Sequence, residues 1–83
     1  MLYTHYLAST KKTVGIRQTM KAIEKGLADK VFIAKDAEKR VVLPVINACQ
    51  NKGISIVEVE TMSELGKACS VQVLTAVAAC LKE

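Results

Sequence analysis

The chain is poor in aromatic residues and contains no tryptophan. Its aromatic side chains are those of Tyr3, Tyr6 and Phe32. Proteins that bind single-stranded RNA commonly stack successive bases on aromatic side chains. This composition therefore disfavours a reader of unpaired bases, and it favours the shape of a folded RNA as the target of any RNA contact.

Cysteine is scarce and widely spaced. Cys49, Cys69 and Cys80 each lie in an apolar stretch, which predicts buried, reduced thiols and argues against a disulfide framework. A zinc site requires ligands at short spacings such as C-x-x-C. The sequence has no such pair, and His5 is its single histidine. We therefore expect neither a metal nor a cofactor.

No constellation of catalytic residues is present. A cysteine nucleophile requires a neighbouring histidine or another cation that activates the thiol, and no motif gives His5 such a partner. Asp29 and Asp36 flank one β-prone run without recognisable catalytic partners. Glu58 and Glu60 lie near the end of another. We interpret these carboxylates as solvated strand ends and predict that the protein is not an enzyme.

Long apolar runs are missing too. No stretch approaches the roughly 20 residues that span a bilayer, and the N-terminus lacks the charged and then apolar pattern of a signal peptide. We therefore expect the protein to be cytoplasmic and to make no membrane contact. With 51% apolar residues, the chain fits one domain with a single core over residues 1–83. No interface signal argues for more than one copy.

Positive charge is in modest excess. Lysine and arginine total 12 against 8 acidic residues, which gives a formal net charge of +4. Such an excess favours an anionic partner without excluding an ordinary soluble protein. Charge alone is therefore weak support for RNA.

The spacing of apolar residues predicts a short helix over residues 2–7 and a second helix that begins at Gly15 and ends at Gly26. Lys11 and Lys12 lie between them on an expected exposed connector. The second helix has one apolar stripe and one polar face. The stripe consists of Ile16, Met20, Ile23 and Leu27.

Two further helices are predicted downstream. Residues 41–49 form an amphipathic pattern that ends at residues 51–53, with Pro44 tolerated only near the first turn. The segment Thr61-Met62-Ser63-Glu64 has the pattern of a capping box. In this motif the Thr61 hydroxyl accepts a hydrogen bond from the N–H of Glu64, and the Glu64 side chain reaches back.

Three β-prone runs alternate with these helices, at residues 31–34, 54–59 and 71–78. The first is expected to be a buried central strand that ends at the turn Lys35-Asp36. The last is expected to follow a turn at Ser70. This alternation predicts an α/β protein, a three-layer α/β/α sandwich with a mainly parallel or mixed sheet.

The segment Gly15-Ile16-Arg17-Gln18-Thr19-Met20-Lys21 is the most informative local pattern. Its glycine opens a helix whose exposed face carries Arg17, Gln18 and Lys21. The first N–H groups of a helix lack intrahelical partners and lie at the positive end of the helix dipole. A glycine at this point therefore lets a phosphate backbone approach closely. The alternative interpretation is an ordinary solvated helix face.

Three motifs in this order resemble the L-seven-Ae (L7Ae) family of kink-turn-binding ribosomal proteins. They are residues 15–21, the strand 31–35 followed by Asp36-Ala37, and Leu65-Gly66-Lys67-Ala68-Cys69-Ser70-Val71. In that family G-x-N-E-x-x-K opens the second helix, and L-G-x-x-C-G followed by a hydrophobic residue forms a loop beside it. The short chain, and Gln18 in place of the acidic residue, resemble the bacterial branch.

The resemblance implies the same three-layer α/β/α sandwich, with a mixed sheet of four or five strands as in the L7Ae and L30e proteins. It also implies a non-enzymatic protein that recognises and stabilises kink-turn RNA, a sharp bend between two stems held by tandem sheared G·A pairs. The expected target is ribosomal RNA or a structured messenger leader, with the protein associated with the ribosome.

By resemblance, the start of the second helix contacts the RNA. Gly15 allows the RNA backbone to approach, and Lys21 contacts a base edge or a phosphate. Arg17 and Gln18 reach the edges of the sheared guanines. The kink makes these contacts possible because the ordinary A-form major groove is too deep and narrow for side chains.

The resemblance also places two loops beside this helix. Asp36 and Ala37 are expected in a turn near the RNA-binding surface. Val71 is expected to offer an apolar contact to bases that the bulge extrudes. The residues expected to shape the second loop are Leu65, Gly66, Ser70 and Val71.

Two residues depart from the family pattern. Arg17 replaces an asparagine and cannot accept a hydrogen bond, which turns base-specific contacts into phosphate contacts. Ser70 stands where the loop usually has glycine, and a positive φ there would strain a serine. These departures leave open an alternative, a protein-interaction or scaffold module of the same fold that has lost specific RNA recognition.

Overall fold

The computed structural model describes residues 11–82, so the helix predicted over residues 2–7 lies outside the described range. Within this range strands and helices alternate along the chain. The elements are β1 (Lys12–Val14), α2 (Ile16–Glu24), β2 (Ala28–Ala34), α3 (Lys39–Lys52), β3 (Ser55–Val59), α4 (Met62–Ala68) and β4 (Val77–Leu81).

The strands of the described chain form one mixed sheet in the order β1-β4-β2-β3. β2 and β3 are parallel, with Lys30 opposite Ser55 and Ala34 opposite Val59. β4 runs antiparallel to both of its neighbours. The last strand of the described chain is therefore a central strand of the sheet.

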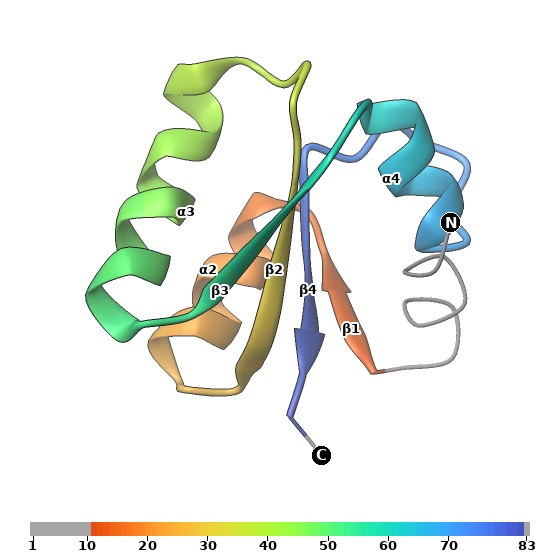
Figure 1. Ribbon diagram of the computed structural model, residues 1–83. Coiled ribbons are helices and arrows are strands. Elements are labelled where there is room, and N and C mark those ends of the chain that lie inside the picture. Colours follow the sequence, from red (N-terminus) through yellow and green to blue (C-terminus); the bar gives the residue numbers. More distant parts are fainter. Residues whose placement is uncertain (1–10, 83) are drawn as a thin grey trace.

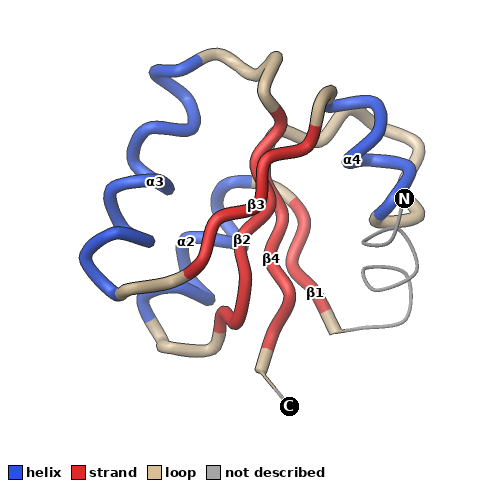
Figure 2. The backbone as a smooth tube through the Cα atoms, viewed as in Figure 1, coloured by secondary structure: helices blue, strands red, loops and turns tan. Residues whose placement is uncertain are grey.

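Helices cover both faces of this sheet. α2 and α3 pack together on one face, and α4 lies on the opposite face (Figure 1). Figure 2 shows the same layers, with the strands between α2 and α3 on one side and α4 on the other. The predicted three-layer α/β/α sandwich is therefore confirmed, and the described part of its mixed sheet has four strands.

The core is centred on β2 and β4. Phe32 and Val77 are almost fully buried. Burial of a large apolar side chain contributes about 1.5–3 kcal/mol, so these two strands do much to hold the layers together. Cys49, Cys69 and Cys80 are buried and form no disulfide bonds in the described chain, as the sequence predicts.

α2 begins and ends at glycines, as predicted. Gly15 is its N-cap, and Gly26 follows the helix with a φ of +71°. Ile23 is fully buried, whereas Leu27 is 48% exposed. The predicted apolar stripe is therefore wrong at Leu27, because the chain turns at Gly26 before helical spacing reaches that residue.

α3 is longer than predicted. It extends from Lys39 to Lys52 and ends at Gly53, which adopts the left-handed conformation with a φ of +68°. Pro44 lies inside the helix, beyond the first-turn position that the sequence predicts. Because proline has no N–H, the carbonyl of Arg40 loses its intrahelical donor.

Several predicted strand boundaries are wrong, and β2 begins at Ala28 instead of residue 31. Lys12 lies in β1 and not on a connector, because it pairs with Cys80 of β4. The last strand spans Val77–Leu81 instead of residues 71–78. Val77 pairs with Ile33, next to the final residue of β2. Residues 71–75 therefore find no partner strand within the described sheet, and they belong to a loop after α4.

Candidate nucleic-acid interface

One end of the sheet brings together the segments that carry the predicted site residues. β1, β2 and β3 end there, and β4 begins there (Figure 1). The N–H of Gly15 donates to the carbonyl of Val77 at 2.9 Å, and the N–H of Ala34 donates to the carbonyl of Ala76 at 2.9 Å. These bonds join three segments, which we call the loop end: residues 15–21, 35–38 and 60–76.

Gly15 adopts a backbone conformation that favours glycine, with a φ of +95° and a ψ of 161°. A Cβ at this position would meet nothing within 4 Å. The positive φ of this turn therefore requires a glycine, whereas the space around the residue would accommodate a side chain. The space beside the start of α2 is open, so an anion can approach the free N–H groups of its first turn.

Three predicted site residues lie together on the solvent face of α2. Arg17, Gln18 and Lys21 are exposed, whereas Thr19 is fully buried. The hydroxyl oxygens of Thr13 and Thr19 lie 3.0 Å apart in a hydrogen bond. This contact ties the first turn of α2 to β1 and fixes which face of the helix is presented to solvent.

Asp36 connects the turn after β2 to α4. Its Oδ1 accepts a hydrogen bond from the N–H of Met62 at 2.8 Å. The Thr61 hydroxyl accepts one from the N–H of Glu64 at 3.0 Å, which confirms the predicted cap. Two otherwise free N–H groups at the start of α4 are thus satisfied by side chains. Ala37, next to Asp36, is buried.

The return half of the predicted capping box is not formed in the described chain. Oε2 of Glu64 is buried and has no hydrogen-bond partner there, and the hydrogen bond of the motif runs only from the Glu64 N–H to the Thr61 hydroxyl. Asp36 supplies the second cap, from a turn that is distant in the sequence. The start of α4 therefore depends on the turn after β2.

The loop after α4 stays close to the helix through backbone hydrogen bonds. The N–H of Val71 donates to the carbonyl of Gly66 at 3.0 Å, and the N–H of Thr75 donates to that of Met62 at 3.2 Å. Gly66 is buried. A Cβ on this glycine would overlap the carbonyl oxygen of Val73. The missing side chain thus lets the loop pass directly against α4.

Ser70 has a positive φ of +62°, which no other non-glycine residue of the described chain shares. Its position therefore does require the left-handed conformation, which costs an L-residue roughly 1–2 kcal/mol. The N–H of Ser70 donates to the carbonyl of Lys67 at 3.0 Å, where α4 ends. Leu65 is fully buried one turn earlier and supports the loop from within the core.

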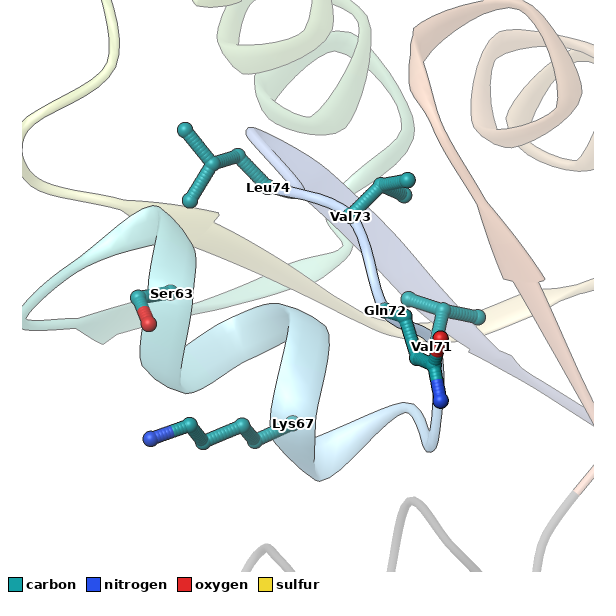
Figure 3. A pocket seen from close by; sticks show the side chains of 6 residues that line it. All are labelled: Ser63, Lys67, Val71, Gln72, Val73 and Leu74. Carbon is teal, nitrogen blue, oxygen red and sulfur yellow. The ribbon is translucent and has the colours of Figure 1, made fainter.

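An apolar groove lies between α4 and this loop (Figure 3). Val73 and Leu74 are 66% and 67% exposed, which leaves large apolar side chains beside one another in solvent. Exposed apolar surface of this kind marks contact sites when it is contiguous. The groove has a volume of about 300 Å³ and is lined by Ser63, Lys67, Val71, Gln72, Val73 and Leu74.

Residues 5–83 match the model of the Ribosomal protein L7Ae/L30e/S12e/Gadd45 family. The chain belongs to this family. A similar protein is RNA-binding protein TTE2299 of Caldanaerobacter subterraneus subsp. tengcongensis, 48% identical over 69 residues that cover 83% of this chain and 84% of the relative. RNA-binding protein YbxF of Geobacillus stearothermophilus is 34% identical over 99% of this chain and its own full length.

Two further proteins with ribosomal or RNA-binding names are also similar. Large ribosomal subunit protein eL8 of Halobacterium salinarum is 44% identical over 72 residues, 86% of this chain and 58% of the relative. The solved structure of the Giardia lamblia 15.5kD RNA binding protein superposes with a TM-score of 0.87 at 34% identity. That superposition covers 99% of this chain and 69% of the other. The family resemblance read from the sequence motifs is thus confirmed.

Sequence reasoning misses Val73 and Leu74 as surface residues of this L7Ae-family protein. They belong to an apolar run that favours a strand with a buried face. The signal that could have found the loop is Gly66, because a glycine inside a helical pattern often has a packing reason. Here the reason is the carbonyl of Val73, which occupies the place of a side chain.

Residues 11–82 contain no group of three His, Cys, Asp or Glu side chains placed to hold a metal ion. Burial raises the pKa of the Cys69 thiol, and the charge of Lys12 opposes this shift without cancelling it. Burial also raises the pKa of Cys49, so neither thiol is activated. None of the described helices has the length and apolar character to cross a membrane.

Proposed function

We propose that this protein binds structured RNA through the loop end, and that its preferred RNA contains a kink-turn. The observation that carries the proposal is the hydrogen-bonded junction of Gly15 with Val77, which sets the open start of α2 beside the loop of Val73 and Leu74. The helix start offers N–H groups and cations to phosphates. The loop offers apolar surface to unstacked bases. Relatives named RNA-binding proteins support this ligand class.

A bent RNA suits this arrangement better than a regular duplex. In A-form RNA the major groove is too narrow for Arg17 and Gln18 to reach the base edges. A kink opens the groove, and preferential affinity for that conformer is enough to shift the RNA toward it. In this proposal Lys21 contacts a base edge or a phosphate, while Asp36 and Ala37 hold the neighbouring turn. The residues that shape the second loop are Leu65, Gly66, Ser70 and Val71.

We further propose that the protein binds ribosomal RNA and associates with the ribosome. The similarity to large ribosomal subunit protein eL8 supports ribosomal RNA as the target and association with the ribosome. We expect the protein to act as a single copy in the cytoplasm and without catalysis.

A second candidate function is a protein-interaction module that keeps the fold and has lost specific RNA recognition. Arg17 in place of asparagine and the left-handed Ser70 favour it, because both lie at the proposed contact surface. An arginine can still bind phosphates or the acceptor edge of guanine. The two candidates therefore differ in selectivity for the kinked RNA.

Calorimetry at physiological salt separates these functions. One RNA contains a standard kink-turn, and the other is identical except that Watson–Crick pairs replace the sheared G·A pairs. We expect selective binding to the first. Equal, weak binding to both would leave only non-specific contact with the basic surface, and no binding to either would favour the interaction module.

Two arginine variants locate the contact. Arg17→Ala removes a guanidinium from the loop end, whereas Arg40→Ala removes one from α3, where Arg40 Nε lies 2.9 Å from Glu38 Oε2 in an exposed ion pair. We expect Arg17→Ala to reduce affinity for the kink-turn RNA several-fold, and Arg40→Ala to leave it unchanged. Equal effects of the two variants would argue against contact through α2.

A further inference from the structure

Charge is distributed unevenly along the strands of the described chain. The half that contains the loop end has six cations and five carboxylates: Arg17, Lys21, Lys35, Lys39, Arg40 and Lys67 against Asp36, Glu38, Glu58, Glu60 and Glu64. The opposite half has six lysines and two carboxylates. We call it the lysine end, formed by Lys11, Lys12, Lys25, Lys30, Lys52 and Lys82 with Glu24 and Asp29.

Backbone hydrogen bonds bring lysine-end segments together. The N–H of Lys82 donates to the carbonyl of Leu27 at 2.8 Å, and the N–H of Leu81 donates to that of Lys11 at 2.9 Å. Lys25 is the C-cap of α2, close to Leu27 in the chain. Figure 1 shows the ends of α2, α3 and β4 and the start of β2 gathered at this side of the molecule.

Strand register places two more lysines at this end of the sheet, on the face that α4 covers. Lys12 of β1 and Lys30 of β2 both lie opposite Cys80, on the two strands that flank β4. Residues opposite one another share a face of the sheet, and neighbouring strands lie about 4.8 Å apart. The backbones at Lys12 and Lys30 are therefore roughly 10 Å apart, and both side chains start on one face.

Ion pairing differs between the two halves. In the half with the loop end, Lys35 Nζ lies 3.2 Å from Glu60 Oε1, and that hydrogen bond raises the pKa of Lys35. Arg40 pairs with Glu38 in the same half. Across residues 11–82, no ion pair is formed by five of the lysine-end residues: Lys11, Lys12, Lys25, Lys52 and Lys82.

Helix dipoles account for only part of the lysine-end charge. Lys25 and Lys52 lie at the C-terminal ends of α2 and α3, where cations are favourable. Each helix end carries about half a negative charge, so two ends offset about one of the four excess positive charges. Glu83 follows Lys82 directly in the sequence and adds one carboxylate. About two positive charges remain without a counterpart.

We propose that the lysine end binds the phosphate backbone of a second RNA segment, separate from the one at the loop end. The two ends are about 23 Å apart, because β2 has seven residues that each extend about 3.3 Å. Lysines contact phosphates as point charges, so this surface selects duplex RNA by charge and not by sequence. RNA binding at the lysine end does not depend on the proposed function. If the loop end binds RNA as well, one protein can bridge two RNA segments, and only this bridging rests on the proposed function.

Matched double variants test the second surface. Lys11→Gln with Lys82→Gln removes two exposed charges from the lysine end, and Lys39→Gln with Arg40→Gln removes two from the start of α3. Affinity for a short RNA duplex without a kink-turn is measured by fluorescence anisotropy between about 50 and 200 mM salt. The lysine-end variant should bind at least about tenfold more weakly, with a salt slope lower by about 1.5–2. The control should change by no more than about twofold.

Two outcomes of this comparison would overturn the proposal. Equal losses for both variants would mean that total charge, and not the lysine end, attracts RNA. The proposal would also fail if only the lysine-end variant lost binding to vesicles of anionic phospholipid while both variants kept duplex affinity. Circular dichroism before binding confirms that both variants are folded. All the substituted side chains are exposed, so the fold should be retained.

A capture experiment tests the bridge. Kink-turn RNA is immobilised and loaded with protein, and a labelled duplex without a kink-turn is then added. The wild type and the α3 control should capture the duplex, whereas the lysine-end variant should bind the kink-turn RNA and fail to capture it. If no variant binds the kink-turn RNA, the proposed function fails, while the duplex titrations still decide the lysine end.

Discussion

The two ends of the sheet differ in what their surfaces depend on. At the loop end, Gly66 makes room for the carbonyl of Val73, Gly15 and Ser70 have positive φ, and backbone bonds lock the segments together. At the lysine end, exposed lysines lie on strand ends and helix ends. A surface that selects RNA by shape needs a fixed backbone, whereas one that attracts phosphates needs only charge.

This difference predicts that the loop end determines selectivity for the kinked RNA, whereas the lysine end contributes non-specific affinity. The half with the loop end is nearly balanced in charge, so its contribution should depend more on geometry and vary less with salt than that of the lysine end. The lysine end should contribute affinity that falls steeply as salt rises, because each phosphate contact releases counterions. Substitutions at the two ends should therefore change different measurements.

The largest effect should come from Gly66→Ala, which disturbs only the loop end. In an open helix, replacing glycine by alanine stabilises by about 0.5–1 kcal/mol. Here the new Cβ would overlap the carbonyl of Val73, so we expect a loss of about 1–3 kcal/mol as the loop shifts. Urea denaturation measures the stability. Selectivity for the kink-turn RNA should fall while duplex binding at the lysine end persists, and a stabilised variant would show that the loop moves freely.

Leu74→Asp should separate binding from stability at the loop end. The side chain is 67% exposed, so the free energy of unfolding should change by less than about 0.5 kcal/mol. Loss of an apolar contact to a base, with a carboxylate placed near phosphates, should weaken kink-turn binding about tenfold, or about 1.4 kcal/mol. Leu43→Asp is the matched control, because Leu43 is 51% exposed on α3. Equal affinities of the two variants for the kink-turn RNA would show that the groove does not contact the RNA.

Lys21→Ala sharpens the comparison within a single helix. Lys21 lies in the last turn of α2 and belongs to the loop-end segment, whereas Lys25, one turn later, is the C-cap and is counted with the lysine end. Lys21→Ala should lower the salt slope for kink-turn RNA by about 1 and weaken binding several-fold, because one phosphate contact is lost. Lys25→Ala should instead lower the slope for plain duplex. If both variants lowered the salt slope equally for both RNAs, the two ends would act as a single diffuse region of positive charge and not as separate surfaces.

Much of the fold could be predicted from local sequence signals. Gly15 and Gly26 bound α2 because glycine tolerates positive φ, and Thr61 caps α4 because its hydroxyl accepts from Glu64 three residues later. Such signals act over a few residues. The limits of β4 could not be predicted in this way, because they are set by β2, whose end at Ala34 leaves the preceding apolar residues without a partner.

The same contrast between local sequence signals and long-range packing applies to the candidate site. A helix motif predicts Arg17, Gln18 and Lys21 as site residues, and the structure places all three on the solvent face of α2. Their contact with RNA remains a prediction. The cap from Asp36 to Met62 links residues 26 positions apart, so no local pattern indicates it. The exposure of Val73 and Leu74 likewise depends on tertiary packing at Gly66.

The smallest expected effect comes from Ser70→Gly, and its sign is informative. Ser70 has a φ of +62°, so glycine should relieve local strain of roughly 1–2 kcal/mol. Glycine also gains more freedom in the unfolded chain, which offsets about 0.5–1 kcal/mol. The net change should be a stabilisation of about 0–1.5 kcal/mol, visible as a higher urea midpoint with an unchanged slope. If kink-turn affinity rises together with stability, the serine had held the loop away from its binding conformation. Unchanged affinity would mean that the N–H of Ser70, bonded to Lys67, already fixes the loop, whereas a destabilised variant would show that the hydroxyl makes a compensating contact.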